Sequence, residues 1–198
     1  MKIIQLILLL ALFSCSDRTT QQNNLALKSE IKPESQSEAQ DWKSEVAETL
    51  KLYGHRNWIV VADGAYPQQS NPAIQTITVD ASQLEVVKFV NQRIEQAGHV
   101  DANIFVDKEL AYVSEKDAKG IDAYRMQLNE LLEGKPVKKK LHEAIIRELD
   151  ASAKLFNVLI IKTDLAIPYT SVFFQLECGY WNAAAEENLR TNIRSYEN

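Results

Sequence analysis

Short apolar runs alternate with amphipathic segments along most of the chain. Residues 58–62 (WIVVA) are continuously apolar and rich in β-branched side chains, which predicts a strand buried on both faces. Residues 74–79 alternate apolar and polar positions, as expected of a half-buried strand. Other segments with strand character lie at residues 103–106, 110–113, 158–161 and 171–176, the first two as separate strands or a hairpin.

Helical periodicity fills the segments between these strands. Ser82 to Glu85 form a capping box that opens a helix, and Gly98 is placed to end it. Apolar positions at helical spacing predict further helices, with Asp41 as the cap of the first, at residues 41–53, 121–132 and 138–156. Because strands and helices interleave, the sequence predicts a single α/β domain with a largely parallel or mixed sheet flanked by helices.

The first forty residues differ from the rest and are assigned no part in the fold. Residues 1–14 combine Lys2 with an apolar stretch and end before Cys15, which predicts a lipoprotein signal peptide and lipidation of Cys15, with an ordinary cleaved secretory signal as the alternative. Residues 15–40 are polar and predict a disordered tether, leaving residues 41–198 as the folded domain. We therefore expect a bacterial cell-envelope protein held at the membrane through a lipid anchor only.

Composition narrows the chemistry. The 27 acidic residues outnumber the 22 basic ones, giving a net charge of −5, so nucleic acid is not an expected partner. The chain has no nucleophile-elbow, phosphate-loop or C-x-x-C motif. His142 and Glu143 begin a zinc-protease pattern that lacks its second histidine, which predicts an exposed pair rather than a metal site. No metal site is expected from these residues.

Two sets of residues are the candidates for a site. Asp63 follows the strand at residues 58–62, where open α/β sheets place ligand groups, and His55 precedes that strand. The alternative is that His55 interacts with a helix end and that Asp63 forms a turn. After the last strand, Tyr180 and Asn182 offer a hydroxyl and an amide suited to a sugar, or else form an exposed strand end with an aromatic plug.

In combination, these residues resemble a known family. Gly54-His55, Asp63 with Pro67, the helix containing Leu141-His142-Glu143, and Glu177 with Tyr180 and Asn182 follow the order seen in the D-ribose pyranase and L-fucose mutarotase family (RbsD/FucU). The resemblance implies an α/β fold, a homo-oligomeric ring (a pentamer or decamer) and interconversion of the ring forms or anomers of a free monosaccharide without a cofactor. It implies His55 and Asp63 as the catalytic pair and Tyr180 and Asn182 as sugar-binding groups.

The chain departs from that pattern in one respect that bears on the site. Pyranase-type members carry a further histidine after the strand that corresponds to residues 158–161, and residues 162–169 contain none. Two functions therefore stay open. One is a monosaccharide mutarotase or pyranase that works by general acid and base catalysis. The other is a non-catalytic carbohydrate-binding or sensing lipoprotein on the same fold.

Overall fold

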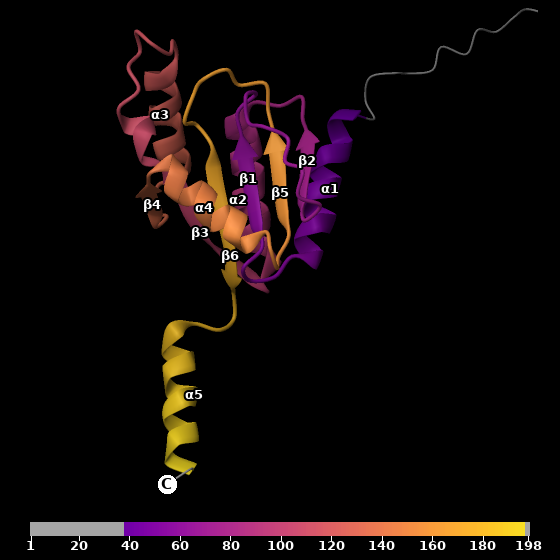
Figure 1. Ribbon diagram of the computed structural model, residues 1–198, viewed down its shortest axis with the longest axis vertical. Helices are drawn as coiled ribbons and strands as arrows, with labels where there is room; N and C mark the ends of the chain where they lie inside the picture. Colours follow the sequence, from indigo (N-terminus) through magenta and orange to yellow (C-terminus); the bar gives the residue numbers. More distant parts are fainter. Residues whose placement is uncertain (1–37, 197–198) are drawn as a thin grey trace, which may run out of the picture. The chain divides into compact units, whose positions relative to one another are not determined.

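The computed structural model describes residues 38–196 (Figure 1). The expected signal segment, Cys15 and nearly all of the expected tether lie outside the described residues. Among the helices of the described part, none is long and apolar enough to cross a membrane.

A six-stranded mixed sheet forms the centre of the domain, in the order β2-β5-β1-β6-β3-β4. The strands are β1 (Trp58–Ala62), β2 (Ile74–Thr78), β3 (Val100–Asp107), β4 (Val137–Lys140), β5 (Val158–Lys162) and β6 (Val172–Cys178). Neighbouring strands run parallel except at β6, which is antiparallel to both β1 and β3. Five strands therefore end at one edge of the sheet, and β6 begins there.

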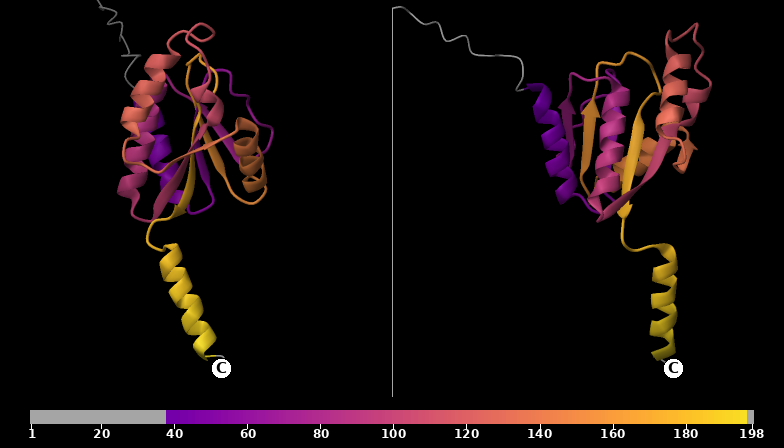
Figure 2. Two further views of the ribbon diagram at one scale, coloured as in Figure 1. Left: turned by 90° about the vertical axis from the view of Figure 1, so that its left-hand side faces the viewer. Right: turned by 180° about the vertical axis from the view of Figure 1, so that it is seen from behind.

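Helices cover both faces of this sheet. Helices α1 (Glu38–Leu52), α2 (Gln83–Ala97) and α3 (Ile121–Leu131) lie on one side of the sheet, and α4 (His142–Ser152) lies on the other (Figure 2). Successive side chains of β1 point to opposite faces of the sheet. Ile59 and Val61 therefore pack with the three helices, while Trp58 and Val60 pack with α4. The structure confirms the expected single α/β domain with a mixed sheet flanked by helices.

The capping signals of α2 behave as expected. The backbone N–H of Glu85 donates to the hydroxyl oxygen of Ser82 at 3.2 Å. Gly98 takes up the left-handed conformation, with φ of 66°, that ends the helix. The expected cap of the first helix was wrong, because α1 begins at Glu38 and contains Asp41 within its first turn.

The single helix expected over residues 138–156 was also wrong. The lysine run forms the edge strand β4, and only then does α4 begin, at His142. Along β4 the ammonium groups of Lys138 and Lys140 lie over the Phe105 ring, 5.6 and 4.4 Å from its centroid. Leu141, an apolar position of the expected helix, is the residue before α4 and is 55% exposed.

Two further segments depart from the expected pattern. Residues 110–113 form no strand, because β3 is followed by a short 3₁₀-helix, η1 (Lys108–Ala111). After β6, the chain forms an unexpected helix, α5 (Ala183–Tyr196), whose first turn is capped by the Asn182 side chain accepting from the backbone N–H of Ala185 at 2.9 Å. No residue of α5 is buried, so nothing in the core depends on it.

Candidate functional site

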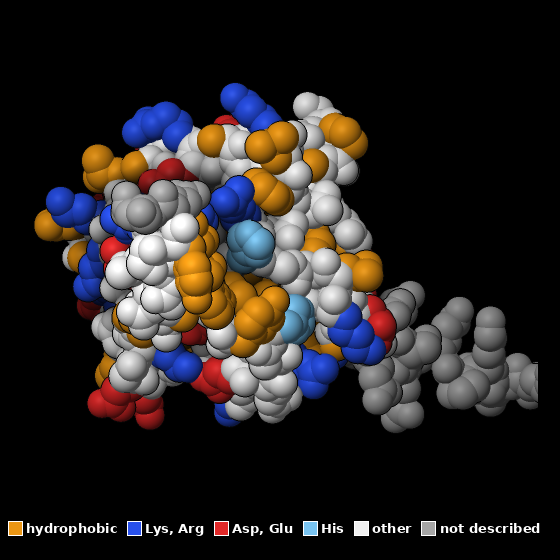
Figure 3. Space-filling model, turned by 90° about the horizontal axis from the view of Figure 1, so that it is seen from below, with side chains coloured by type: hydrophobic (Ala, Val, Ile, Leu, Met, Phe, Trp, Pro, Cys, Tyr) orange, Lys and Arg blue, Asp and Glu red, His pale blue; other side chains and the backbone are white. Residues whose placement is uncertain are grey.

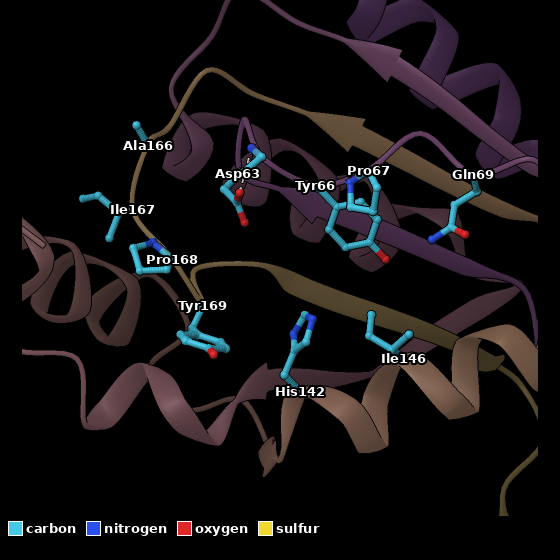
Figure 4. A pocket seen from close by; sticks show the side chains of 11 residues that line it. Asp63, Tyr66, Pro67, Gln69, His142, Ile146, Ala166, Ile167, Pro168 and Tyr169 are labelled. Atoms are coloured by element: carbon cyan, nitrogen blue, oxygen red, sulfur yellow. Dashed lines mark hydrogen bonds between the residues drawn. The ribbon is translucent and has the colours of Figure 1, made fainter.

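The sheet edge where five strands end carries a cavity of about 500 Å³, within the range of small-molecule sites. Asp63 reaches it from the end of β1, His142 from the start of α4, and Tyr169 from the loop that leads into β6. Figure 4 shows these three side chains on different sides of the cavity. The site therefore lies where an open α/β sheet characteristically binds ligands.

Asp63 is held by the turn that follows β1. One carboxylate oxygen accepts from the backbone N–H of Ala65 at 2.9 Å, and the other lies 3.5 Å from the hydroxyl of Ser171. The turn around Gly64 is tight, because a Cβ there would lie 3.3 Å from the carbonyl oxygen of Thr163. Asp63 is half-buried, so its carboxylate is oriented by the protein and still open to the cavity.

His142 lines the cavity and rests on a buried carboxylate. Its Nδ1 lies 3.1 Å from each carboxylate oxygen of Asp107, the last residue of β3. Its backbone N–H donates to the carboxylate of Glu109 in η1, at 3.1 and 3.2 Å, which caps the N-terminus of α4. The side chain of His142 is 33% exposed, whereas that of Asp107 is fully buried.

Burial dominates the titration of Asp107. Removal of the carboxylate from water raises its pKa from 3.8 to about 6, and the neighbouring His142 opposes that rise. Glu109 and Asp63 add to the increase, because their charges disfavour a third carboxylate nearby. The Asp107 carboxyl therefore releases its proton at a pH closer to neutrality than an ordinary aspartate does.

Tyr169 and Tyr66 form opposite walls of the cavity (Figure 4). Tyr169 has a φ of 58°, in the left-handed region that non-glycine residues seldom adopt, and its ring meets the His142 ring edge-on at 5.8 Å. Tyr66 is 6% exposed, and burial raises the pKa of its phenol to about 12. Both tyrosines therefore present apolar ring surface to the cavity.

The structure brings Asp63 into this cavity but places the other predicted site residues elsewhere. His55 lies between α1 and β1, and Tyr180 and Asn182 follow β6, so these three are at the opposite edge of the sheet. All three are exposed, Tyr180 to 76%. Figure 3 views this end, where hydrophobic side chains lie beside histidine. Within one copy of the chain, the predicted catalytic pair does not meet.

The prediction for His142 was wrong. It is a cavity residue on a buried aspartate rather than an exposed pair with Glu143. One signal in the sequence could have located the partner, because Asp107 follows the apolar residues Phe105 and Val106 as Asp63 follows β1. Nothing local indicated that β4 would deliver His142 to the same edge. Within residues 38–196, no three His, Cys, Asp or Glu side chains gather as metal ligands.

Comparison with known proteins places the chain in a family. Residues 41–179 match the RbsD / FucU transport protein family. The chain belongs to this family. The match covers the sheet and α1 to α4 and ends before α5. No curated protein sequence matches the chain.

Among solved structures, the chain is similar to Bacillus subtilis RbsD complexed with D-ribose, with 16% identity, 70% of this chain and 94% of that chain covered, and a TM-score of 0.49. It is also similar to the Streptococcus pneumoniae fucose mutarotase in complex with L-fucose, with 18% identity, 74% and 99% covered, and a TM-score of 0.47. FucU from Bifidobacterium longum gives 16% identity, 70% and 96% covered, and a TM-score of 0.48.

The position of His142 bears on the histidine that is missing after β5. The resemblance implies a histidine after β5 in pyranase-type members, and the loop between β5 and β6 has none. In this chain an imidazole lines the cavity nevertheless, from the start of α4. Absence of histidine from the segment after β5 therefore does not leave the cavity without one.

Proposed function

We propose that this protein is a cofactor-independent mutarotase or pyranase that interconverts the anomers or ring forms of a free monosaccharide. The observation that carries this proposal is the cavity in which Asp63, His142 and Tyr169 face one another. The chain belongs to the RbsD / FucU family, and the resemblance to that family implies this activity. A carboxylate and an imidazole that can hydrogen-bond to hydroxyls, together with apolar ring surfaces, suit a sugar, which presents hydroxyls and C–H faces together.

The reaction needs two proton transfers and no redox step. A base takes the proton of the anomeric hydroxyl while an acid protonates the ring oxygen, so that the bond between the anomeric carbon and the ring oxygen breaks. The resulting carbonyl rotates, or a different hydroxyl attacks it, and the reverse transfers close the ring. Asp63 and His55 are the proposed pair, and each finishes the cycle in its original protonation state.

His55 reaches the cavity in this proposal only from a second copy of the chain. The edge that carries His55 exposes Leu52 at 86%, Leu155 at 82% and Tyr180 at 76%. The cavity rim exposes Tyr169 at 40% and Leu141 at 55%. Apolar side chains exposed at both ends favour a head-to-tail contact that closes into a ring, with a pentamer or decamer implied by the resemblance.

The same neighbour would bring Tyr180 and Asn182 towards the sugar, because both lie at the His55 edge. We further propose that Cys15 carries a lipid that anchors this ring at the bacterial cell envelope, outside the cytoplasm. The sequence around Cys15 supports this anchor.

Nuclear magnetic resonance exchange spectroscopy on ribose, fucose and galactose tests the activity directly. We expect faster exchange between the forms of at least one sugar, and a loss of about 100-fold or more in Asp63→Asn and in His55→Ala. Glu130→Gln is the matched control, since Glu130 is an exposed carboxylate on the outer surface of α2 and α3 and should leave the rate unchanged. Exchange no faster than in buffer for all three sugars would overturn the proposed activity for them.

A non-catalytic carbohydrate-binding or sensing lipoprotein is the second candidate. The observation that favours it is that one copy holds Asp63, His142 and Tyr169 in the cavity without His55. Broadening of sugar resonances on binding, with no acceleration of exchange, would select this function. Loss of that broadening in Asp63→Asn would locate the binding to the cavity.

A further inference from the structure

Asp107 is the one carboxylate among residues 42–196 that is buried, with 1% of its surface exposed. Its side chain forms hydrogen bonds to a single group in the described part of the chain, the Nδ1 of His142. A buried carboxylate is costly unless it is paired, so this contact is the main compensation for its burial. The pair links the end of β3 to the start of α4, beneath the wall of the cavity.

We propose that Asp107 is a positioning residue that holds the neutral His142 ring with its proton on Nδ1 and so presents the Nε2 lone pair to the cavity. A carboxylate accepts hydrogen bonds, so Nδ1 must donate to it. The other ring nitrogen of a neutral imidazole is then an acceptor. The Nε2 of His142 consequently accepts a hydrogen bond from a ligand hydroxyl rather than donating one to the ligand. The sugar identity of that ligand rests on the proposed function.

Two attachments fix the direction of the ring. Glu109 accepts from the backbone N–H of His142, and Asp107 accepts from its Nδ1. Because one attachment holds the backbone and the other holds the ring, the side chain has little freedom to turn away. The Tyr169 ring, edge-on at 5.8 Å, closes a further side of the imidazole. Figure 4 shows the His142 ring extending from α4 into the cavity.

Acidification should reverse the direction of the Nε2 hydrogen bond. When the pair gains one proton, either His142 becomes a cation or a protonated Asp107 donates to Nδ1, and Nε2 carries hydrogen in both cases. The ionisable groups around the pair are Asp63 from the end of β1, Glu109 from η1, Tyr66 and Tyr169 from the cavity walls, Tyr124 from α3, and Lys140, the register partner of Asp107 on β4. Since burial raises the pKa of Asp107 to about 6, we expect this reversal near that pH.

Long-range ¹H–¹⁵N correlation spectra of the full ¹⁵N-labelled chain at pH 8 test the proposal, with His142 assigned by the His142→Gln variant. In the wild type we expect hydrogen on Nδ1 and none on Nε2. In Asp107→Asn, whose amide can accept from Nδ1 or donate to it, we expect a mixture of tautomers. Asp101→Asn removes a charge from the same strand and should leave the spectrum of His142 unchanged. Hydrogen on Nε2 in the wild type would overturn the proposal without any variant.

Sugar exchange provides an independent second readout. In Asp107→Asn we expect kcat to fall about ten- to a hundred-fold with KM nearly constant, as for partners that orient a functional group. The decline in kcat of the wild type below about pH 6 should weaken in the same variant. If the wild type accelerates no sugar, the proposed function fails while the tautomer spectra still decide the role of Asp107. Unchanged tautomers in a folded Asp107→Asn protein would overturn that role.

Discussion

The two ends of the sheet differ in how completely the chain organises them. At the cavity end, Asp63, Asp107 and His142 each have a hydrogen bond to a neighbouring group, and Asp107 is fully buried. At the opposite end, His55 is exposed and Tyr180 follows β6 at 76% exposure. Groups that a fold pre-positions are ready to act in a single copy, whereas exposed groups acquire a fixed geometry only from a partner.

The two ends of the sheet are alike in one respect, an unusual backbone conformation. The two non-glycine residues with positive φ in the described part of the chain are Tyr169, in the cavity, and Arg56, next to His55. Such conformations persist only where the surroundings enforce them, and they concentrate at functional sites. Arg56 is enforced by its backbone N–H, which donates to Leu176 at 2.7 Å. The fold therefore holds the backbone at both ends, but of the proposed catalytic pair it holds only the Asp63 side chain, at the cavity end.

Mixing two inactive variants is the strongest test of whether the two ends of the sheet act together. The largest effect is expected from this experiment. Asp63→Asn keeps an intact His55 end, and His55→Ala keeps an intact cavity. If the site joins two copies head to tail, random co-assembly of equal amounts should restore about a quarter of the contacts, and hence about a quarter of wild-type exchange. The measurement is exchange spectroscopy on the mixture after the variants are refolded together.

The double variant Asp63→Asn with His55→Ala, refolded with wild type, is the control for this mixture. It should restore no activity beyond that of the wild-type contacts that form. Full activity of His55→Ala alone would show instead that the cavity end acts without the other end.

Gly179 tests how firmly the His55 end is built. A Cβ at this position would lie 2.8 Å from the backbone of Val100, so Gly179→Ala should force the end of β6 away from β3. We expect a loss of about 1–3 kcal/mol in the free energy of unfolding, as for other overpacked sites, measured by urea denaturation. Gly54→Ala is the control, because nothing lies within 4 Å of its added Cβ. Equal stability of both variants would contradict the close packing at Gly179.

Asp107→Asn should show a smaller effect that depends on pH. The pKa of Asp107 is raised from 3.8 to about 6, so its burial favours folding at acid pH, and this contribution is lost as the pH rises through about 6. Because asparagine does not titrate, the melting temperature of the variant relative to wild type should rise by a few degrees between pH 4 and pH 8. A difference that stays constant between these pH values would contradict the raised pKa.

Local patterns were sufficient for every strand of the sheet except β4, and for Asp63. The run WIVVA predicted β1 because uninterrupted β-branched residues suit a strand covered on both faces, and Asp63 followed as a residue at the strand end. The helix α2 was predicted from its two caps, Ser82 and Gly98. In each case, the interactions that decide the structure lie within a few residues of one another.

His142 escaped prediction because its partner is 35 residues away. The lysines before it resemble a helix start, and only pairing with β3 makes them the strand β4. That pairing brings the start of α4 to the edge where Asp107 lies. The helix α5 was missed for a different reason, since a helix with no buried face leaves no long apolar pattern to detect.

The strand β6 connects the two ends of the sheet in the direction opposite to that of its neighbours β1 and β3. Ser171 beside Asp63 precedes this strand and Tyr180 follows it, and its seven residues cover about 24 Å. In the proposed head-to-tail ring, the length of this strand would set the distance between the two contact surfaces of each subunit. Lengthening β6 by two residues would keep each side chain on its own face of the sheet. We expect this change to alter the number of subunits in the ring while both ends keep their local structure.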